Sequence, residues 1–219
     1  GKTLLAMDFA YAAQQLGGIV LWADAEATFD GLWAQKNGLD LEKIVLLPEE
    51  NEIETISDWQ ADMIVHYREK LKNNEPILLV VDSTAALETR DNMEAADMDS
   101  GEDMGKRSKK IYQMLRKRNK FYARYGVCVI YINQLRSRPV KTQFEDPDTT
   151  PGGKAMRYYA SIRMGLYRGK KIVNAKDKKV GNIVYIRGKK NKTAPPSENI
   201  KANVYFKPFQ NKLGYDKYE

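Results

Sequence analysis

The chain has few of the residues that build disulfides, zinc sites or membrane spans. Its 219 residues include one cysteine, Cys128, and one histidine, His66. A single cysteine excludes an internal disulfide, and the lack of a His/Cys cluster argues against a zinc site or a Cys/His nucleophile. A single cysteine also suits a reducing cytosol. No apolar run approaches the roughly 20 residues that span a bilayer. We therefore expect a cytoplasmic protein without a membrane partner.

Acidic and basic residues are divided unevenly along the chain. Residues 1–105 contain 7 Lys and Arg against 22 Asp and Glu, a net charge of −15, whereas residues 106–219 contain 29 against 7, a net charge of +22. The basic half predicts a polyanion such as nucleic acid as a partner. Two alternatives stay open. The acidic half of one subunit could meet the basic half of another, or the uneven charge could serve solubility alone.

Apolar segments of helical and extended pattern alternate along the first part of the chain. Short apolar strands are predicted at 19–22, 44–47, 77–81 and 127–132. Helices are predicted at about 4–16, 29–37, 52–72 and 105–125. Strands that are apolar throughout indicate a largely parallel sheet with helices on both faces, and we expect 127–132 to be central in it.

The rest of the chain adds loops and further strands. Residues 90–104 and 135–153 are predicted to be long loops, which in a compact domain are commonly functional. Three later strands are expected at about 160–168, 181–189 and 201–207. Alternating polarity in the last two predicts antiparallel strands at the edge of the sheet. The expected fold class is a single α/β domain over residues 1–219.

The first three residues, Gly1-Lys2-Thr3, match the end of the phosphate-binding motif G-x-x-x-x-G-K-[ST]. In that motif backbone N–H groups cradle the phosphates, the lysine neutralises them, and the hydroxyl binds Mg²⁺. We expect Lys2 to contact the β- and γ-phosphates and Thr3 to bind Mg²⁺. The glycine-rich part of the motif lies outside this sequence, so we expect the chain on its own to bind ATP feebly.

Polar side chains follow three of the predicted strands. They are Glu26, Asp82 and Gln134, and the carboxyl ends of parallel strands would gather them beside the phosphate-binding residues. Asp82 is expected to hold Mg²⁺ through water, with a helix N-cap as the alternative. Glu26 is expected to polarise the water that attacks the γ-phosphate, with an ordinary loop acid as the alternative. Gln134 could hydrogen-bond the γ-phosphate and report nucleotide state to the following loop, or only cap its strand.

Aromatic residues suggest contacts with bases. Trp33 lies on the helix after Glu26, where it could stack on adenine or pack in the core. The loop after Gln134 combines three cations with one aromatic side chain, namely Arg136, Arg138, Lys141 and Phe144. Cations track phosphates and an aromatic ring stacks on bases, so this composition is typical of a loop that binds single-stranded DNA. A solvated charge run is the alternative.

Together these segments resemble the bacterial RecA recombinase family over nearly the whole chain. The resemblance rests on GKTLLA at 1–6, DAEATFD at 24–30, LLVVDSTAAL at 78–87, INQLR at 132–136, DPDTTPGGKAMRYYASIRM at 146–164 and KKNKTAPP at 189–196. The last two stretches are the most specific. The resemblance implies a RecA-like P-loop NTPase core without the family's N-terminal oligomerisation segment and C-terminal domain. The differences from typical bacterial members suggest a divergent or phage-encoded version.

The resemblance also implies roles for individual residues. Glu26 would be the catalytic glutamate and Asp82 the Walker B acid. Adenine would be contacted by Asp30 and Trp33, although tyrosine is usual at the second position. Residues 92–104 and 135–152 would be the two DNA-binding loops, and the DNA-facing residues would also include Gly152, Gly153 and Arg163. Across a filament interface, the neighbour's ATP would be reached by Lys190 and Lys192, which would stabilise charge as arginine fingers do.

Two departures from the family pattern concern the DNA-binding loops. The first loop is unusually acidic, with Asp91, Glu94, Asp97, Asp99, Glu102 and Asp103. In the second loop Pro151 stands where the family has threonine. Acidic side chains repel phosphates, so the first loop differs from what the resemblance alone implies.

The function predicted from these observations is homologous recombination driven by ATP and Mg²⁺. Subunits would form a helical filament on single-stranded DNA, pair it with homologous double-stranded DNA and exchange strands, with hydrolysis resetting the filament. A ring-forming helicase or branch-migration ATPase on the same core is one alternative. A recombination mediator that binds DNA without turnover is another.

Overall fold

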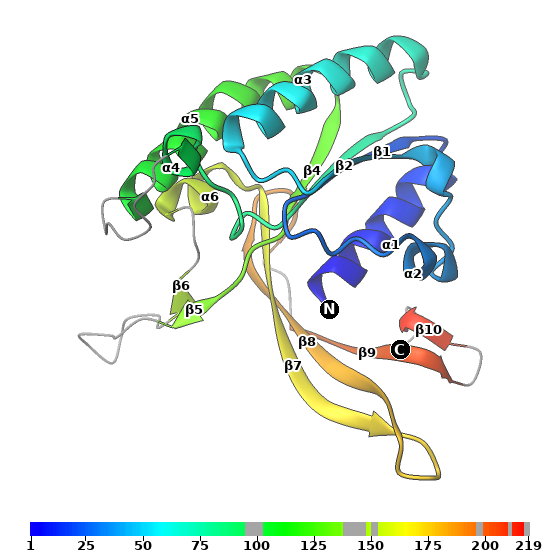
Figure 1. Ribbon diagram of the computed structural model, residues 1–219. Helices are drawn as coiled ribbons and strands as arrows, with labels where there is room; N and C mark the ends of the chain where they lie inside the picture. Colours follow the sequence, from blue (N-terminus) through cyan, green and yellow to red (C-terminus); the bar gives the residue numbers. More distant parts are fainter. Residues whose placement is uncertain (95–102, 138–147, 150–152, 196–198, 210–211, 217–219) are drawn as a thin grey trace.

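The computed structural model describes residues 1–94, 103–137, 148–149, 153–195, 199–209 and 212–216 (Figure 1). Its elements in chain order are α1 (Lys2–Gln15), β1 (Ile19–Asp24), α2 (Gly31–Lys36), the 3₁₀ turn η1 (Leu41–Lys43), β2 (Ile44–Pro48), α3 (Ile53–Lys70), β3 (Ile77–Asp82), α4 (Arg90–Glu94), α5 (Asp103–Arg124), β4 (Val127–Tyr131), β5 (Arg136–Ser137), β6 (Asp148–Thr149), α6 (Gly153–Tyr159), β7 (Ile162–Val173), β8 (Lys179–Asn191), β9 (Ile200–Phe209) and β10 (Lys212–Tyr215). Among the described helices, none is both long and apolar enough to cross a membrane.

Four of the strands form the parallel sheet that the apolar segments predict. Its order is β2-β1-β3-β4, and all neighbouring pairs are parallel. Every residue of β1 and β3 is buried, as expected for strands covered on both faces. In the described part of the chain β4 is the edge of this sheet rather than its centre, and Cys128 is exposed.

Helices cover both faces of the parallel sheet, as Figure 1 shows. On one face α1 packs against alternate side chains of the two central strands, among them Val20, Trp22, Leu78 and Val80. On the other face α3 and α5 pack against the remaining side chains, among them Leu21, Ala23, Leu79 and Val81. The division follows from the twofold side-chain period of a strand.

The return from α1 into β1 depends on two glycines. Gly17 has φ +81°, a left-handed conformation in which a residue without a Cβ ends a helix without strain. At Gly18 a Cβ would lie 2.2 Å from the backbone oxygen of Pro76, so only glycine fits there. The tight turn sets α1 against the sheet and carries its first turn toward the carboxyl ends of the strands.

The antiparallel strands predicted for the C-terminal part are present, but they form a sheet of their own. Its order is β10-β9-β8-β7, and α1 lies between this sheet and the parallel one (Figure 1). Side chains from both sheets join α1 in one core cluster, including Val184, Val204 and Tyr215. The Tyr215 hydroxyl also donates to the backbone oxygen of Gly1 at 3.1 Å. The antiparallel sheet therefore covers the N-terminal end of α1.

The two predicted long loops contain short ordered elements. The first begins with α4 and ends where α5 starts at Asp103, while residues 95–102 lie outside the described part. The second contains β5 and β6, which pair antiparallel with Arg136 opposite Thr149. β5 begins four residues after Ile132, so Gln134 lies in the short segment that links β4 to this hairpin.

Candidate nucleotide site and nucleic-acid surface

The carboxyl ends of three parallel strands meet at one edge of the sheet. Asp24 at the end of β1 is in register with Asp82 at the end of β3. Beyond these ends, the backbone N–H of Glu26 donates to the backbone oxygen of Asp82 at 3.3 Å. The backbone N–H of Ile132, just past β4, donates to the backbone oxygen of Val81 at 3.0 Å. These backbone bonds fix the segments that carry the predicted catalytic side chains.

Thr3 and Asp82 meet at this edge. The Thr3 hydroxyl, in the first turn of α1, donates to Oδ2 of Asp82 at 2.8 Å. Burial raises the pKa of Asp82; the Thr3 hydrogen bond lowers it, and the nearby carboxylates of Glu26 and Asp24 raise it further. A turn, not a helix, follows Asp82, so the helix-cap alternative is wrong. A hydroxyl and a carboxylate are hard oxygen ligands of the kind that Mg²⁺ prefers, so this pair fits the metal.

Glu26 and Gln134, which are 108 positions apart in the sequence, are joined directly. The Gln134 side-chain amide donates to Oε1 of Glu26 at 2.8 Å. The Ser83 hydroxyl donates to the same carboxylate oxygen. The predicted gathering of strand-end residues is therefore present, and it includes Ser83, which the sequence alone did not identify as a site residue.

The loop that carries Glu26 is held by the buried carboxylate of Asp24. That carboxylate accepts the backbone N–H groups of Thr28 at 3.2 Å and Phe29 at 2.7 Å. Asp24 is 4% exposed, and its two bonds close the chain into a compact turn between β1 and α2. Glu26 therefore projects from a restrained backbone rather than from a free loop.

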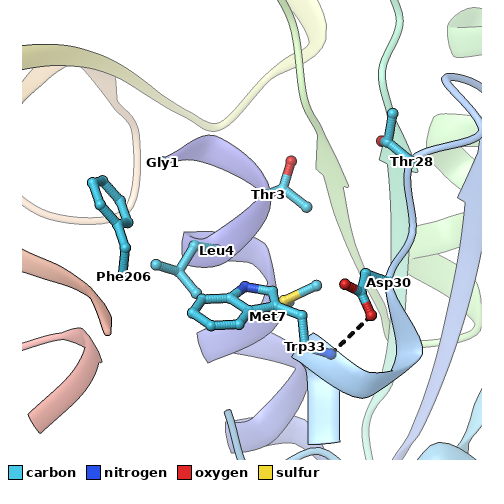
Figure 2. A pocket seen from close by; sticks show the side chains of 8 residues that line it. All are labelled: Gly1, Thr3, Leu4, Met7, Thr28, Asp30, Trp33 and Phe206. Atoms are coloured by element: carbon cyan, nitrogen blue, oxygen red, sulfur yellow. Dashed lines mark hydrogen bonds between the residues drawn. The ribbon is translucent and has the colours of Figure 1, made fainter. Parts of the chain in front are cut away.

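A cavity of about 350 Å³ opens beside the first turn of α1 (Figure 2). It is lined by Gly1, Thr3, Leu4, Met7, Thr28, Asp30, Trp33 and Phe206. Asp30 accepts the backbone N–H of Trp33 at 3.0 Å and so caps α2. Trp33 is half-buried and packs against the core, which is the packing alternative raised for this residue, while its stacking on adenine stays a prediction.

Phe206 reaches the cavity from β9, as Figure 2 shows. Sequence reasoning missed it as a site residue. The alternation at 202–206 predicts a strand but does not say which neighbour that strand covers. Only the folding of the antiparallel sheet over α1 brings this ring to the cavity that Trp33 lines.

The outer face of α5 carries a row of exposed cations, which are Lys109, Arg116, Lys120 and Arg124. These positions span about 22 Å along the helix at 1.5 Å per residue. Other cations of α5 pair with acids on its inner side, where Arg107 binds Glu88 at 3.0 Å and Lys110 binds Glu54 at 2.6 Å. The sequence shows that this segment is rich in lysine and arginine. It does not show that cations on one side of the helix form ion pairs while those on the other side are exposed.

The predicted DNA-binding residues differ in how far the structure describes them. Arg138, Lys141, Phe144 and Gly152 lie outside the described residues. The backbone of Arg136 forms β5, and Gly153 begins α6. Arg163 lies in β7 in register with Lys190 of β8.

Lys190 contacts the end of α6. Its Nζ donates to the backbone oxygens of Arg157 at 2.7 Å and Tyr158 at 3.0 Å. Partial desolvation and then the charges of Lys192 and Arg163 lower the pKa of Lys190. Within one chain this lysine therefore closes the C-terminal end of a helix, and the role predicted for Lys190 and Lys192 toward a neighbouring subunit stays a prediction.

The parallel sheet with helices on both faces, and the Thr3–Asp82 and Glu26–Gln134 pairs at the carboxyl edge of its strands, define an α/β protein of the P-loop type of architecture. The sequence model of the RecA N-terminal domain matches residues 1–209. The chain belongs to the RecA family.

Individual relatives agree with this assignment. The chain is 33% identical over 215 residues to Protein RecA of Cytophaga hutchinsonii, a match that covers 98% of the chain and 57% of the relative. It is 34% identical over 208 residues to Protein RecA of Thermus thermophilus, covering 94% and 57%. It is 32% identical over 206 residues to Protein RecA of Bifidobacterium breve, covering 94% and 50%. The chain thus spans between half and three-fifths of the length of these curated relatives.

Proposed function

We propose that residues 1–219 form the ATPase core domain of a recombinase that assembles on single-stranded DNA and exchanges strands with a homologous duplex. The observation that carries the proposal is the direct contact of Gln134 with Glu26, beside the Thr3–Asp82 pair. The polar network at this edge of the sheet thus consists of two side-chain pairs, and the backbone bond from the Glu26 N–H to the Asp82 oxygen joins them. Gln134 directly precedes the loop that we propose as the second DNA-binding loop. This network supports coupling of hydrolysis to DNA binding.

Each residue of the network has a role in phosphoryl transfer. Lys2, the residue before Thr3, would neutralise the β- and γ-phosphates, and Thr3 and Asp82 would hold Mg²⁺, which would supply further charge neutralisation. Glu26 orients the attacking water and accepts its proton. Among the described residues both hydrogen bonds to the Glu26 carboxylate fall on Oε1, which leaves Oε2 as the oxygen to accept the proton of the water. Gln134 moves between Glu26 and the γ-phosphate and so reports nucleotide state to the loop that begins at Leu135.

The adenine occupies the cavity of Figure 2, between Trp33 and Phe206. Replacing either ring by alanine in the full-length protein should raise the Kd for ATP about tenfold, because a base stacked on an aromatic ring gains about 1–3 kcal/mol. Isothermal titration calorimetry measures this. Phe9→Ala is the matched control, because Phe9 is an exposed ring of α1 that does not line the cavity. Unchanged affinity in both cavity variants would place the adenine elsewhere.

The DNA is held by cations from several elements. The exposed row of α5 contributes phosphate contacts, together with Arg136, Arg138 and Lys141 of the second loop and Arg163 of β7. Phe144 stacks on bases, and the glycines at 152 and 153 allow the DNA backbone to approach closely. In the filament Lys190 and Lys192 stabilise the charge on a neighbour's ATP. The charge of +22 on residues 106–219 supports a polyanion partner for this half.

The test of this function is ATP turnover by the full-length protein with and without single-stranded DNA. We expect DNA to raise turnover at least tenfold, because DNA bound by the second loop draws Gln134 away from Glu26. Electron microscopy of the same mixture should show helical filaments. Closed rings would favour the helicase or branch-migration alternative, and DNA binding without any turnover would favour the mediator.

A further inference from the structure

The Ser83 hydroxyl and the Gln134 amide both donate to the Glu26 carboxylate, but their backbone segments are restrained to different degrees. Ser83 is 1% exposed and follows directly on the last residue of β3. Its neighbour Thr84 is tied to the backbone oxygen of Ile132 twice, through the backbone N–H at 2.9 Å and the side-chain hydroxyl at 3.0 Å. The Ser83 backbone oxygen also accepts the N–H of Ala86 at 3.1 Å. The Ser83 hydroxyl therefore projects from a buried and closed turn.

Gln134, the other donor, is exposed and lies beyond the end of β4. Its backbone N–H donates to the side chain of Asn133 at 2.8 Å, a bond within the same segment. Gln134 therefore has the freedom to leave Glu26, whereas Ser83 does not. When the Gln134 amide turns to the γ-phosphate, the hydrogen bond from Ser83 still orients the Glu26 carboxylate.

We propose that Ser83 is a positioning residue that keeps Glu26 aimed at the attacking water while Gln134 is engaged with the nucleotide. This inference rests on the proposed function. A glutamate side chain has three rotatable bonds, so a carboxylate without a fixed donor samples many orientations, few of which place Oε2 against the water. The Ser83 hydroxyl restricts the orientation of the Glu26 carboxylate during hydrolysis, when Gln134 contacts the nucleotide and no longer holds Glu26.

The experiment is steady-state ATP hydrolysis by the full-length protein on single-stranded DNA. Ser83→Ala should lower kcat about 10- to 100-fold, the range for losing one hydrogen bond to a charged group, and leave the KM for ATP unchanged. Ser83→Cys, which keeps the volume but donates weakly, should show the same loss. Ser83→Thr, which keeps the hydroxyl, should restore kcat to within about threefold.

Two further variants separate positioning from a general structural effect. In a Glu26→Gln background Ser83→Ala should cause little additional loss, because a residue that acts through Glu26 has nothing left to orient. The matched control is Ser57→Ala, which removes another buried serine hydroxyl, one that accepts a hydrogen bond from Arg118 at 2.9 Å. It should leave kcat unchanged.

The outcomes are distinct. Unchanged kcat in Ser83→Ala, an equal loss in both backgrounds, or a folded but inactive Ser83→Thr would each overturn the positioning role while leaving the proposed function intact. Absence of turnover in the unmodified protein would refute the proposed function and this inference together.

Discussion

Replacing Glu26 by glutamine in the full-length protein should lower kcat for ATP hydrolysis about 100-fold or more and leave the affinity for ATP nearly unchanged. A positioned base contributes about 10²- to 10⁴-fold to a rate, and glutamine cannot accept the proton of the attacking water. The substitution keeps the shape of the side chain, and its amide oxygen can still accept the bonds from Ser83 and Gln134. Loss of rate without loss of binding therefore isolates the chemical role.

Single-turnover hydrolysis on single-stranded DNA, with calorimetry for ATP binding, measures both quantities. Glu42→Gln is the matched control, because Glu42 is an exposed glutamate in the same acidic half and lies on η1, at the amino end of β2 and away from the carboxyl ends of the strands. Turnover of Glu26→Gln within threefold of the unmodified protein would remove Glu26 from the chemistry and leave the Glu26–Gln134 contact as a structural one.

Replacing Lys109, Arg116 and Lys120 of α5 by alanine should weaken the binding of single-stranded DNA about 100-fold at about 0.1 M salt. Each lost phosphate contact lowers the slope of log K against log salt by about 0.7, so three contacts lower it by about 2. The three side chains are exposed on one face of the helix, so their loss changes charge without opening the core. Fluorescence anisotropy over a series of salt concentrations gives affinity and slope together.

A control with the same change of charge is the triple variant of Lys36, Lys43 and Lys72, which are exposed cations of the acidic half. It should change the slope little. If the α5 variant binds DNA with an unaltered slope but assembles less readily in light scattering, the row faces the acidic half of a neighbouring subunit instead. That result would favour the subunit-contact alternative for the division of charge.

The strands of the parallel sheet could be predicted from the sequence, because each contains a short, continuous run of apolar residues. Continuous apolar runs at 19–22 and 77–81 favour strands covered on both faces, and both are buried strands of the parallel sheet. The run at 127–132 has the same composition, yet β4 is an edge strand in the described part. Composition reports how apolar a strand is and not which strands lie beside it.

The candidate site was predictable for a topological reason. Because parallel strands share one carboxyl edge, Glu26, Asp82 and Gln134 could be expected together from their positions after strands alone. Ser83 could not be recognised in this way, because a serine after a strand end is equally suited to a turn, a helix cap or a hydrogen bond to a distant carboxylate.

The amino-acid sequence by itself determined the alternation of strands and helices, the polar residues at the strand ends, the division of charge and the family. These depend on side-chain type and spacing, which are properties of the chain alone. Only the tertiary structure decided that Ser83 and Gln134 share one oxygen of Glu26, that Phe206 comes over α1 to the cavity of Trp33, and that one face of α5 pairs with acids while the other stays exposed. These depend on which surfaces meet when the two sheets close on α1, and long-range packing rather than local pattern sets that arrangement.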